Sequence, residues 1–161
     1  MSSPVTADDL VTGATEYLAV YADVRAVLGK EPGTNNLYLY RHRPWVKIEN
    51  SQSTICVLTR TTGWAPPNLH NTMRFPRLGV DIWVDPLRDT DNNVVDPDEA
   101  VRRAFNAYTV IDRHLHRPQG GERWFGTIRT IACERIVEPI LLPTNPDTPL
   151  RLQVFYAVTE G

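Results

Sequence analysis

The sequence has 161 residues, of which 42% are hydrophobic and 22% are charged, and its formal net charge is −2. A chain of this size and composition builds one domain with a real core, which excludes an intrinsically disordered protein. The absence of a basic excess argues against proteins that grip nucleic acid or anionic lipid, and no apolar stretch approaches the roughly 20 residues of a membrane span. We therefore expect a single domain over residues 1–161 with no membrane contact.

The N-terminal segment has the pattern of an amphipathic helix over about 7–28. Asp8 and Asp9 fall in its first turn, where negative charge complements the helix dipole. Apolar residues then recur at steps of three and four along one face, namely Leu10, Ala14, Tyr17, Leu18, Tyr21, Val24 and Leu28. Gly29 is placed to end the helix in a left-handed conformation. The pattern predicts one continuous helix with a buried stripe.

Residues 30–53 are less regular, and two interpretations remain open: two short strands, or an extended arm. Pro44 would confine any strand pairing here to the edge of a sheet, because proline donates no backbone hydrogen bond. Residues 54–61 follow as a predicted strand with both faces at least partly covered. A proline-containing loop over 63–71 then separates this strand from the next one.

Residues 74–84 alternate cleanly between apolar and polar side chains, which predicts a strand with one face on the core. The core-facing side chains would be Leu78, Val80, Ile82 and Val84. Trp83 falls on the opposite face among polar neighbours. A large aromatic there is typical of a subunit interface, although a loop of the same chain could also cover it.

A polar, mostly acidic loop over 85–96 leads into a second predicted helix. Asp96, Pro97 and Glu99 form a strong start signal, with an N-cap, a proline at the first helical position and an acidic first turn. The helix would run to the residues before Pro118. Its predicted buried stripe consists of Val101, Ala104, Phe105, Tyr108, Ile111 and Leu115.

Two further strands complete the chain. Residues 124–137 are rich in β-branched and aromatic side chains but change phase near 131–133, which indicates a bulge or a strand covered on both sides. Residues 150–159 alternate again, with Phe155 pointing away from the core. Amphipathic helices and one-sided strands predict an α+β fold. Two helices would pack on one face of a mainly antiparallel sheet in a two-layer sandwich, with an extended arm.

Part of the acidic loop is similar to the start of a calcium-binding loop. Asp89, Asp91 and Asn93 offer alternating oxygen ligands, but Val94 stands where the sharp-turn glycine is needed and Ala100 where the bidentate glutamate is needed. We interpret these aspartates as turn residues, which often hydrogen-bond to their own backbone. No metal is expected.

Other chemistry-bearing residues form no recognisable constellation. His114 and His116 are two apart on a helix and point to different faces, and Cys56 and Cys133 stand alone in separate strands as expected buried thiols. Nucleophile-elbow and glycine-rich phosphate motifs are missing from the sequence. We expect no enzyme activity, no catalytic residue and no cofactor.

The arm interleaves positive charge with an aromatic side chain through Arg41, Arg43, Trp45 and Lys47. Such a segment suits a subunit contact, because arginine pairs with carboxylates and tryptophan fills pockets. A nucleic-acid groove is the alternative, which the negative net charge makes less favourable. We predict a subunit interface that uses these four residues together with Trp83 and Phe155. The acidic loop of a neighbouring copy is a plausible partner of the arm.

The order of these elements, together with segments such as 77–84 (RLGVDIWV) and 100–104 (AVRRA), resembles the tail terminator proteins of long-tailed (siphovirus) bacteriophages, notably those infecting actinobacteria. The resemblance runs from about residue 6 to residue 159. It implies a structural virion protein that forms a ring, a hexamer in this family, on the head-proximal end of the tail tube. That ring would stop tube polymerisation and provide the head–tail joining surface.

The resemblance also implies the partners: further copies of the chain, the tail tube protein and a neck or head-completion protein. DNA would only pass through the lumen, and assembly would take place in the host cytoplasm. Asp85, Arg88, Asp89 and Asp91 are candidates for the lumen or for the rim that faces the tube. Two alternatives remain: another neck or tail ring protein, such as a head-completion or tail-tube subunit, or a nucleic-acid-binding accessory protein.

Overall fold

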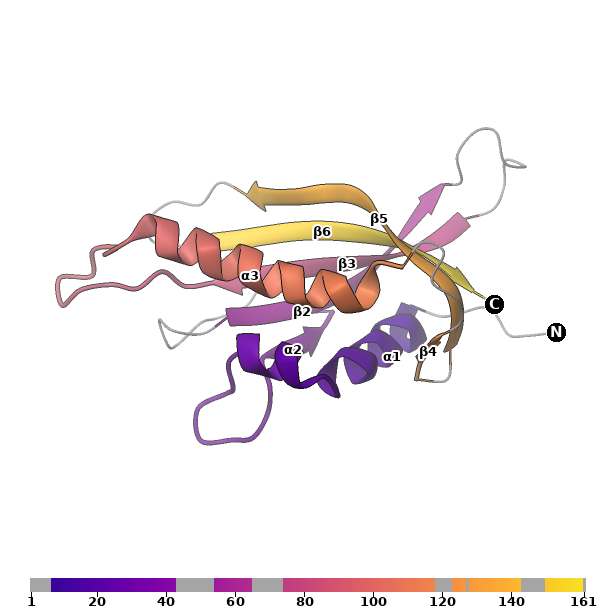
Figure 1. Cartoon of the computed structure of the whole chain (residues 1–161), viewed down its shortest axis with the longest axis horizontal. Helices are drawn as coiled ribbons and strands as arrows, with labels where there is room; N and C mark the ends of the chain where they lie inside the picture. Colours follow the sequence, from indigo (N-terminus) through magenta and orange to yellow (C-terminus); the bar gives the residue numbers. More distant parts are fainter. Residues whose placement is uncertain are drawn as a thin grey trace.

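The computed structural model describes residues 7–42, 54–64, 74–117, 123–126, 128–142 and 150–160. The elements are α1 (Ala7–Ala19), α2 (Ala22–Val27), β1 (Leu39–Arg41), β2 (Thr54–Trp64), β3 (Arg74–Val84), α3 (Pro97–Leu115), β4 (Arg123–Phe125), β5 (Ile128–Leu142) and β6 (Leu150–Glu160). The helices lie on one side of the sheet, with α3 running along the long strands and α1 and α2 beside it (Figure 1). The predicted two-layer α+β fold is confirmed. None of the helices described here is long and apolar enough to span a membrane.

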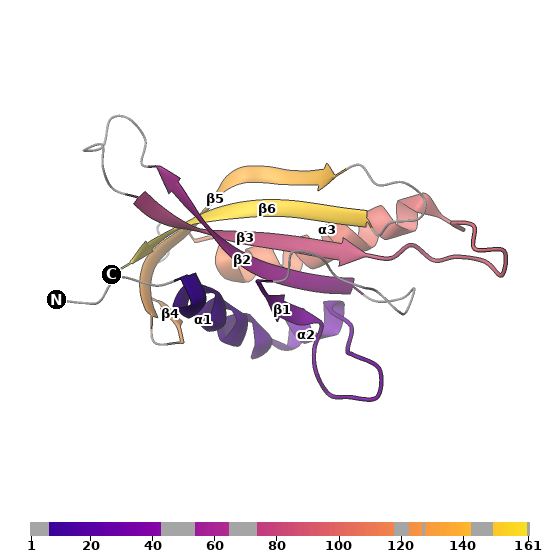
Figure 2. The ribbon, with the colours of Figure 1, turned by 180° about the vertical axis from the view of Figure 1, so that it is seen from behind.

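The strands form a six-stranded sheet in the order β1-β2-β3-β6-β5-β4. All neighbouring strands pair antiparallel except β1, which runs parallel to β2. The view from behind shows β1 at one edge of the sheet and β5 at the other, with β4 pairing only with the start of β5 (Figure 2). The two edges of the sheet therefore differ in sequence and in structure.

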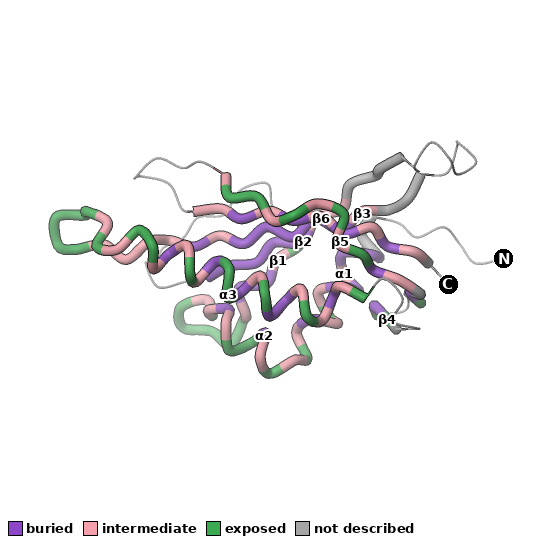
Figure 3. Tube along the Cα trace, turned by 45° about the horizontal axis from the view of Figure 1, so that its top comes forward, coloured by how far each residue is buried: buried purple, intermediate pink, exposed green. Residues whose placement is uncertain are grey.

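The core lies between the helices and the sheet, where buried segments concentrate (Figure 3). The alternation predicted for β3 is confirmed, because Leu78, Val80, Ile82 and Val84 are all fully buried. The neighbouring strand β6 contributes its own alternating set, Leu152, Val154, Tyr156 and Val158. Burial of these side chains supplies the main stabilisation of the sheet against the helices.

The prediction of one continuous helix over 7–28 is wrong at residues 20 and 21. The chain leaves helical geometry at Tyr21, whose φ is −83° and ψ is 127°. The Tyr21 ring stacks on His114 of α3 with ring centroids 3.8 Å apart, and the Arg25 guanidinium donates to the Ala19 carbonyl at 2.9 Å. Tertiary packing and a side-chain cap thus divide the segment into α1 and α2.

The predicted left-handed cap at Gly29 is also wrong. Leu28 ends α2 in extended geometry, and the N–H of Gly29 donates to the Thr54 carbonyl at 3.1 Å. The glycines with positive φ in the described ranges are Gly33 and Gly126. Because Gly29 hydrogen-bonds to the start of β2, the chain leads straight towards the sheet.

The start of α3 follows the prediction, since the Asp96 side chain accepts hydrogen bonds from the N–H groups of Asp98 and Glu99. The predicted stripe needs two corrections, because Val101 is only half-buried and lies outside the core, and Phe105 is exposed. Phe105 is 36% exposed, whereas Ala104 and Ile111 are fully buried. Alanines at 100, 104 and 107 form the buried side of the helix that faces the sheet. The Phe105 ring lies to the side of this buried face.

Two less regular regions are described in part. Of the two interpretations of 30–53, the described residues show one short edge strand, β1, and residues 43–53 lie outside the described ranges. In β5, the predicted change of phase is confirmed as a register shift between Thr130 and Ala132. Two more shifts follow, after Arg135 and after Val137, so the second half of β5 is bulged.

Candidate functional site

The outer face of the sheet, away from the helices, carries a compact polar and aromatic cluster. Trp83 on β3 lies opposite Arg151 on β6, and the Arg151 guanidinium sits over the Trp83 ring at 5.0 Å from its centroid. The same guanidinium donates to Asp81 Oδ2 at 2.6 Å. Asp81 is only 5% exposed, so this ion pair is desolvated on the carboxylate side. Strand register alone brings the three side chains together.

This cluster is incompletely satisfied. Asp81 Oδ1, Trp83 Nε1 and Arg151 Nε are buried polar atoms without a hydrogen-bond partner in the described structure. Buried polar atoms normally have partners, so a face that carries several such atoms suits a contact that completes them. Beside the cluster, Trp83 and Tyr40 pack against a second apolar group of buried side chains, Tyr38, Ile55 and Val57.

The structure places both predicted outer-face aromatics on that face. Trp83 is half-buried beneath Arg151, and Phe155 lies opposite Gly79, where its ring would stand only 3.3 Å from a Cβ added to the glycine. Asp81 and Arg151 were not among the predicted site residues. The signal available was the spacing of two between Asp81 and Trp83, which places them on one face of a strand.

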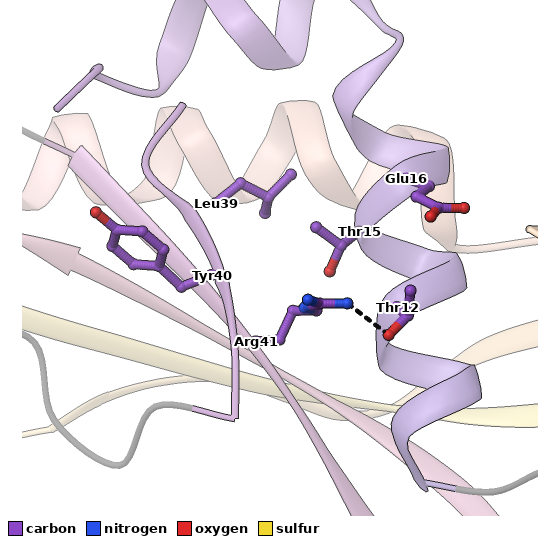
Figure 4. Close-up of a pocket in the computed structure, with 6 residues that line it drawn as sticks. All are labelled: Thr12, Thr15, Glu16, Leu39, Tyr40 and Arg41. Carbon is purple, nitrogen blue, oxygen red and sulfur yellow. Dashed lines mark hydrogen bonds between the residues drawn. The ribbon is translucent and has the colours of Figure 1, made fainter. Parts of the chain in front are cut away.

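Of the predicted arm residues, only Arg41 lies within the described ranges; Arg43, Trp45 and Lys47 lie outside them. Arg41 is exposed and its Nη1 donates to Thr12 Oγ1 of α1 at 2.7 Å (Figure 4). This bonded pair lies at an open concavity of about 530 Å³. Its lining consists of Thr12, Thr15, Glu16, Leu39, Tyr40 and Arg41. The hydroxyls of Thr12 and Thr15, together with the opposite charges of Glu16 and Arg41, suit polar contacts with another protein.

The acidic loop over 85–96 is an ordered hairpin that extends beyond the end of the sheet (Figure 1). Asp89 Oδ1 accepts hydrogen bonds from the N–H groups of Asp91 and Asn93, both at 2.9 Å. Asn92 has a φ of 65°, a left-handed conformation that asparagine tolerates. Arg88 donates to the Asn92 carbonyl at 3.2 Å and lies 3.9 Å from Asp85. The hairpin presents exposed Asp89 and Asp91 at its tip.

A polar network joins α3 to the sheet on the helix side. Asp112 accepts from the Tyr156 hydroxyl at 2.6 Å and from Arg135 Nη1 at 2.8 Å. The same guanidinium nitrogen donates to the Tyr108 hydroxyl at 2.9 Å. Burial first, and then the Asp112 carboxylate, raises the pKa of Tyr156 far above its ordinary value. The tyrosine therefore stays protonated, and the network acts as a structural link.

A second polar link connects α2 to α3. His114 Nε2 lies 2.8 Å from Asp23 Oδ1 and 2.9 Å from Asp23 Oδ2, while Tyr17 donates from its hydroxyl to the His114 carbonyl at 3.0 Å. Partial burial acts to raise the pKa of Asp23, but the hydrogen bond and charge of His114 outweigh it, so the pKa lies below its ordinary value. This link fixes the orientation of α2 against α3.

Comparisons with known proteins find similarity among solved structures. No family model matches the chain, and no curated protein matches it. Among solved structures, the fold is similar to that of a chain in the virion of a native gene transfer agent (GTA) particle, with a TM-score of 0.56 and 15% sequence identity. The match covers 94% of this chain and 95% of that chain. At this identity the likeness shows the fold, over essentially the whole length of both chains.

Proposed function

We propose that this chain is a structural protein of a phage-like virion. The observation that carries the proposal is the end-to-end likeness of its fold to a chain of the gene transfer agent virion, with 94% and 95% of the two chains covered. A match of this extent involves the whole arrangement of helices and strands and not one shared motif. The outer-face cluster of Asp81, Trp83 and Arg151 also suits binding to another protein, because several of its buried polar atoms lack a hydrogen-bond partner in the described structure.

Within that class, we propose a tail terminator. Copies of the chain form a ring, a hexamer, on the head-proximal end of the tail tube, stop further tube growth and offer a surface to a neck or head-completion protein. Support comes from the sequence resemblance and from the two unlike edges of the sheet, because a closed ring needs two different patches on each subunit. The outer-face cluster of Asp81, Trp83 and Arg151 gives a further contact surface.

The acidic hairpin has a role in this proposal. Residues 85–96 contain four aspartates and one arginine, and the tip is exposed. Facing the lumen or the tube-side rim, it keeps the passage free of basic groups. DNA would otherwise adhere through its phosphates, with counterion release as the driving force.

The test in the phage that encodes the chain is deletion of its gene, followed by electron microscopy of the tails. A tail terminator predicts overlong tails without heads, and a plasmid copy of the gene restores normal length. Normal-length tails that fail to join heads would indicate a head-completion protein instead, and a complete lack of tubes would indicate a tube subunit. Normal tails joined to heads would exclude all three roles.

A further inference from the structure

We propose that the acidic hairpin of one copy binds the exposed face of the β4–β5 hairpin on a second copy. On the acidic hairpin the contact uses the face that carries Leu87, Asp89, Asn93 and Val95, which we call the acidic face. On the second copy it uses the pair of Trp124 and Arg129, which we call the Trp124 face. The inference rests on the proposed function, since it takes the second copy to be the next subunit of the ring. It keeps the acidic hairpin as one half of the predicted contact and replaces the arm by β4 and β5 as the other half.

The acidic hairpin has two faces that differ in burial. Arg88 and Val94 lie opposite each other in an isolated antiparallel bridge, with a backbone hydrogen bond on either side of it. Because successive residues of paired strands point to opposite faces, the residues at 87, 89, 93 and 95 share the other face. Arg88 and Val94 are half-buried, whereas Asp89 is exposed and Val95 is 63% exposed. The acidic face therefore presents a carboxylate and an apolar side chain together.

The acidic hairpin is ordered by its own hydrogen bonds. Asp89 Oδ1 accepts from the N–H groups of Asp91 and Asn93, and Arg88 Nη1 donates to the Asn92 carbonyl at 3.2 Å. A surface that is ordered before binding loses little conformational entropy on association. The hairpin is therefore suited to extend from its own subunit and bind another one.

The β4–β5 hairpin also has one buried face and one exposed face. Phe125 lies opposite Ile128, and both are buried. Trp124 lies opposite Arg129 on the other face, and both are exposed. At 56%, Trp124 is the most exposed aromatic side chain among those that the structure describes. Tryptophan and arginine are enriched among the residues that contribute most to the energy of protein interfaces, so this pair has the composition of an anchor.

Packing against α1 holds the Trp124 face in place. The centroid of the Phe125 ring lies 4.9 Å from that of the Tyr17 ring. Gly13 approaches β4 so closely that a Cβ added there would stand 2.2 Å from the Phe125 carbonyl oxygen. Gly126 turns the chain back with a φ of 61°, a conformation that glycine adopts without strain. The Trp124 ring is thus presented by an anchored hairpin.

The two faces have complementary chemistry. Asp89 offers a carboxylate to Arg129, and Val95 offers an aliphatic surface to the Trp124 ring. Asp91, exposed at the tip, adds a second negative charge close to Asp89 in the chain. Opposite charges favour this pairing, whereas two acidic faces would repel each other. The complementarity therefore selects a contact between unlike faces.

The two faces lie at opposite ends of the molecule. The acidic hairpin extends beyond one end of the sheet, and β4 lies towards the other end of the long axis (Figure 1). Figure 3 shows the same separation from another side. One chain therefore cannot close this contact on itself. Unlike patches on one subunit produce head-to-tail association, which closes into a ring when the rotation between subunits allows it.

The described part of the arm fits the acidic face less well. Arg41 is exposed, but its neighbours in β1 are the buried Leu39 and the half-buried Tyr40. It offers a positive charge without an exposed aromatic ring beside it. Val95 of the acidic face would therefore lack an apolar partner there.

Disulfide trapping in the full-length protein tests the contact. Cys56 and Cys133 are buried and free, so an Asn93→Cys, Arg129→Cys variant carries one new reactive pair. After mild oxidation, a non-reducing gel is expected to show a ladder from dimer up to the size of the ring, whereas each single variant stops at dimer. The comparison variant Asn93→Cys, Glu138→Cys is expected to give no ladder. An equal ladder in both double variants, a cross-link only within one chain, or no ladder even at the highest soluble protein concentration would overturn the proposal.

Sedimentation equilibrium tests the charge pair. Asp89→Asn keeps an oxygen that can accept the two backbone hydrogen bonds of the tip but removes the charge. We expect this variant and Arg129→Gln each to raise the dissociation constant of self-association roughly threefold or more. The double variant should lose less than the product of the two single losses, because both changes remove the same interaction. Glu138→Gln, at an 85% exposed side chain outside both faces, is the matched control and should leave the constant unchanged.

The same measurement tests the aromatic anchor. We expect Trp124→Ala to raise the dissociation constant roughly tenfold or more. Phe105→Ala, which removes an exposed aromatic ring of α3, should have no effect, and unchanged melting temperatures show that both variants are folded. Equal weakening by Phe105→Ala, or independent losses for Asp89→Asn and Arg129→Gln, would contradict the inference. So would a wild-type chain that shows no measurable self-association.

The two proposals can fail separately. If trapping succeeds but the gene deletion leaves tail length normal, the copies associate through the two faces and the terminator function is wrong. If the deletion gives overlong tails but no ladder forms, the function stands and the contact is wrong. If Trp124→Ala leaves self-association unchanged but abolishes binding to the tube subunit, the Trp124 face binds the tube protein and the inference is wrong.

Discussion

Asp112 is the residue on which the attachment of α3 to the sheet depends most. It accepts from a fully buried Tyr156 and from Arg135, so its removal leaves the Tyr156 hydroxyl without its acceptor and takes from Arg135 its carboxylate partner on α3. We expect Asp112→Ala to lower the free energy of unfolding by about 2–3 kcal/mol, because orphaned buried polar groups cost their desolvation energy. Urea denaturation measures it. Tyr156→Phe, which leaves the Asp112–Arg135 pair intact, should cost about 1 kcal/mol, and an equal loss in both variants would contradict this account.

Asp23 makes stability depend on pH through its contact with His114. The pKa of Asp23 in the folded protein lies below its ordinary value of 3.8. A lowered pKa means that the stabilisation is fully present above the ordinary value and is lost as the pH falls through the folded-state value. We therefore expect thermal unfolding scans to show a decline in the melting temperature on acidification below about pH 4, and Asp23→Asn to reduce that decline. An unchanged slope in the variant would show that other carboxylates are responsible.

Single residues were predictable where one strand or helix decides their environment. The buried set of β3 and the Asp96 cap follow from local pattern, and both are confirmed. The ion pair between Asp81 and Arg151 could not be predicted, because its partners are 70 residues apart and meet only through strand register. Phe105 has the sequence spacing of a core residue. It is nevertheless exposed, because the neighbouring Ala104 and Ala107 occupy the side of the helix that packs on the core.

At the scale of elements, α1 and α2 show how tertiary contact overrides local pattern. Val20 and Tyr21 continue a good helical sequence, so no local signal marks a break. The stacking of Tyr21 on His114 and the cap from Arg25 supply it. For residues 30–53, the sequence left open two short strands or an extended arm, because a three-residue strand is too short to show an alternating pattern. The pairing of β1 with β2 shows that the described part of this segment contains one strand.

The packing of α1 against β4 depends on a glycine. A Cβ added to Gly13 would stand 2.2 Å from the Phe125 carbonyl oxygen, and a backbone atom cannot yield as a flexible side chain can. We expect Gly13→Ala to lower the free energy of unfolding by roughly 2–3 kcal/mol, even though alanine favours the helix, because overpacking forces the two elements apart. Chemical denaturation measures the loss, with Glu16→Ala at an exposed position of the same helix as control. A Gly13→Ala protein as stable as the control would show that the close approach is relaxed in solution.

At the scale of the whole molecule, the two edges of the sheet carry different side chains. The β1 edge leads into a basic, tryptophan-containing segment, and the β5 edge carries exposed aliphatic side chains with glutamates. The sequence predicted the fold class, and the role of the basic segment as a contact surface stays a prediction. The exposed side chains of the β5 edge could not be predicted, because the exposure of Leu141 follows from where the helix layer ends, which depends on how α3 settles over β3 and β6. The predicted roles of Trp83, Phe155 and the acidic hairpin in assembly remain predictions.

The most direct measurement of the central claim is the length of tail tubes grown in the presence of this protein. Purified tube subunits are allowed to polymerise with increasing amounts of the full chain, and tube lengths are measured by electron microscopy. The proposal predicts tubes that shorten as the ratio of this protein to tube subunit rises, each with a ring at one end. Tubes of unchanged length, with no ring at either end at any ratio, would contradict the assignment of this chain as the protein that ends tail growth.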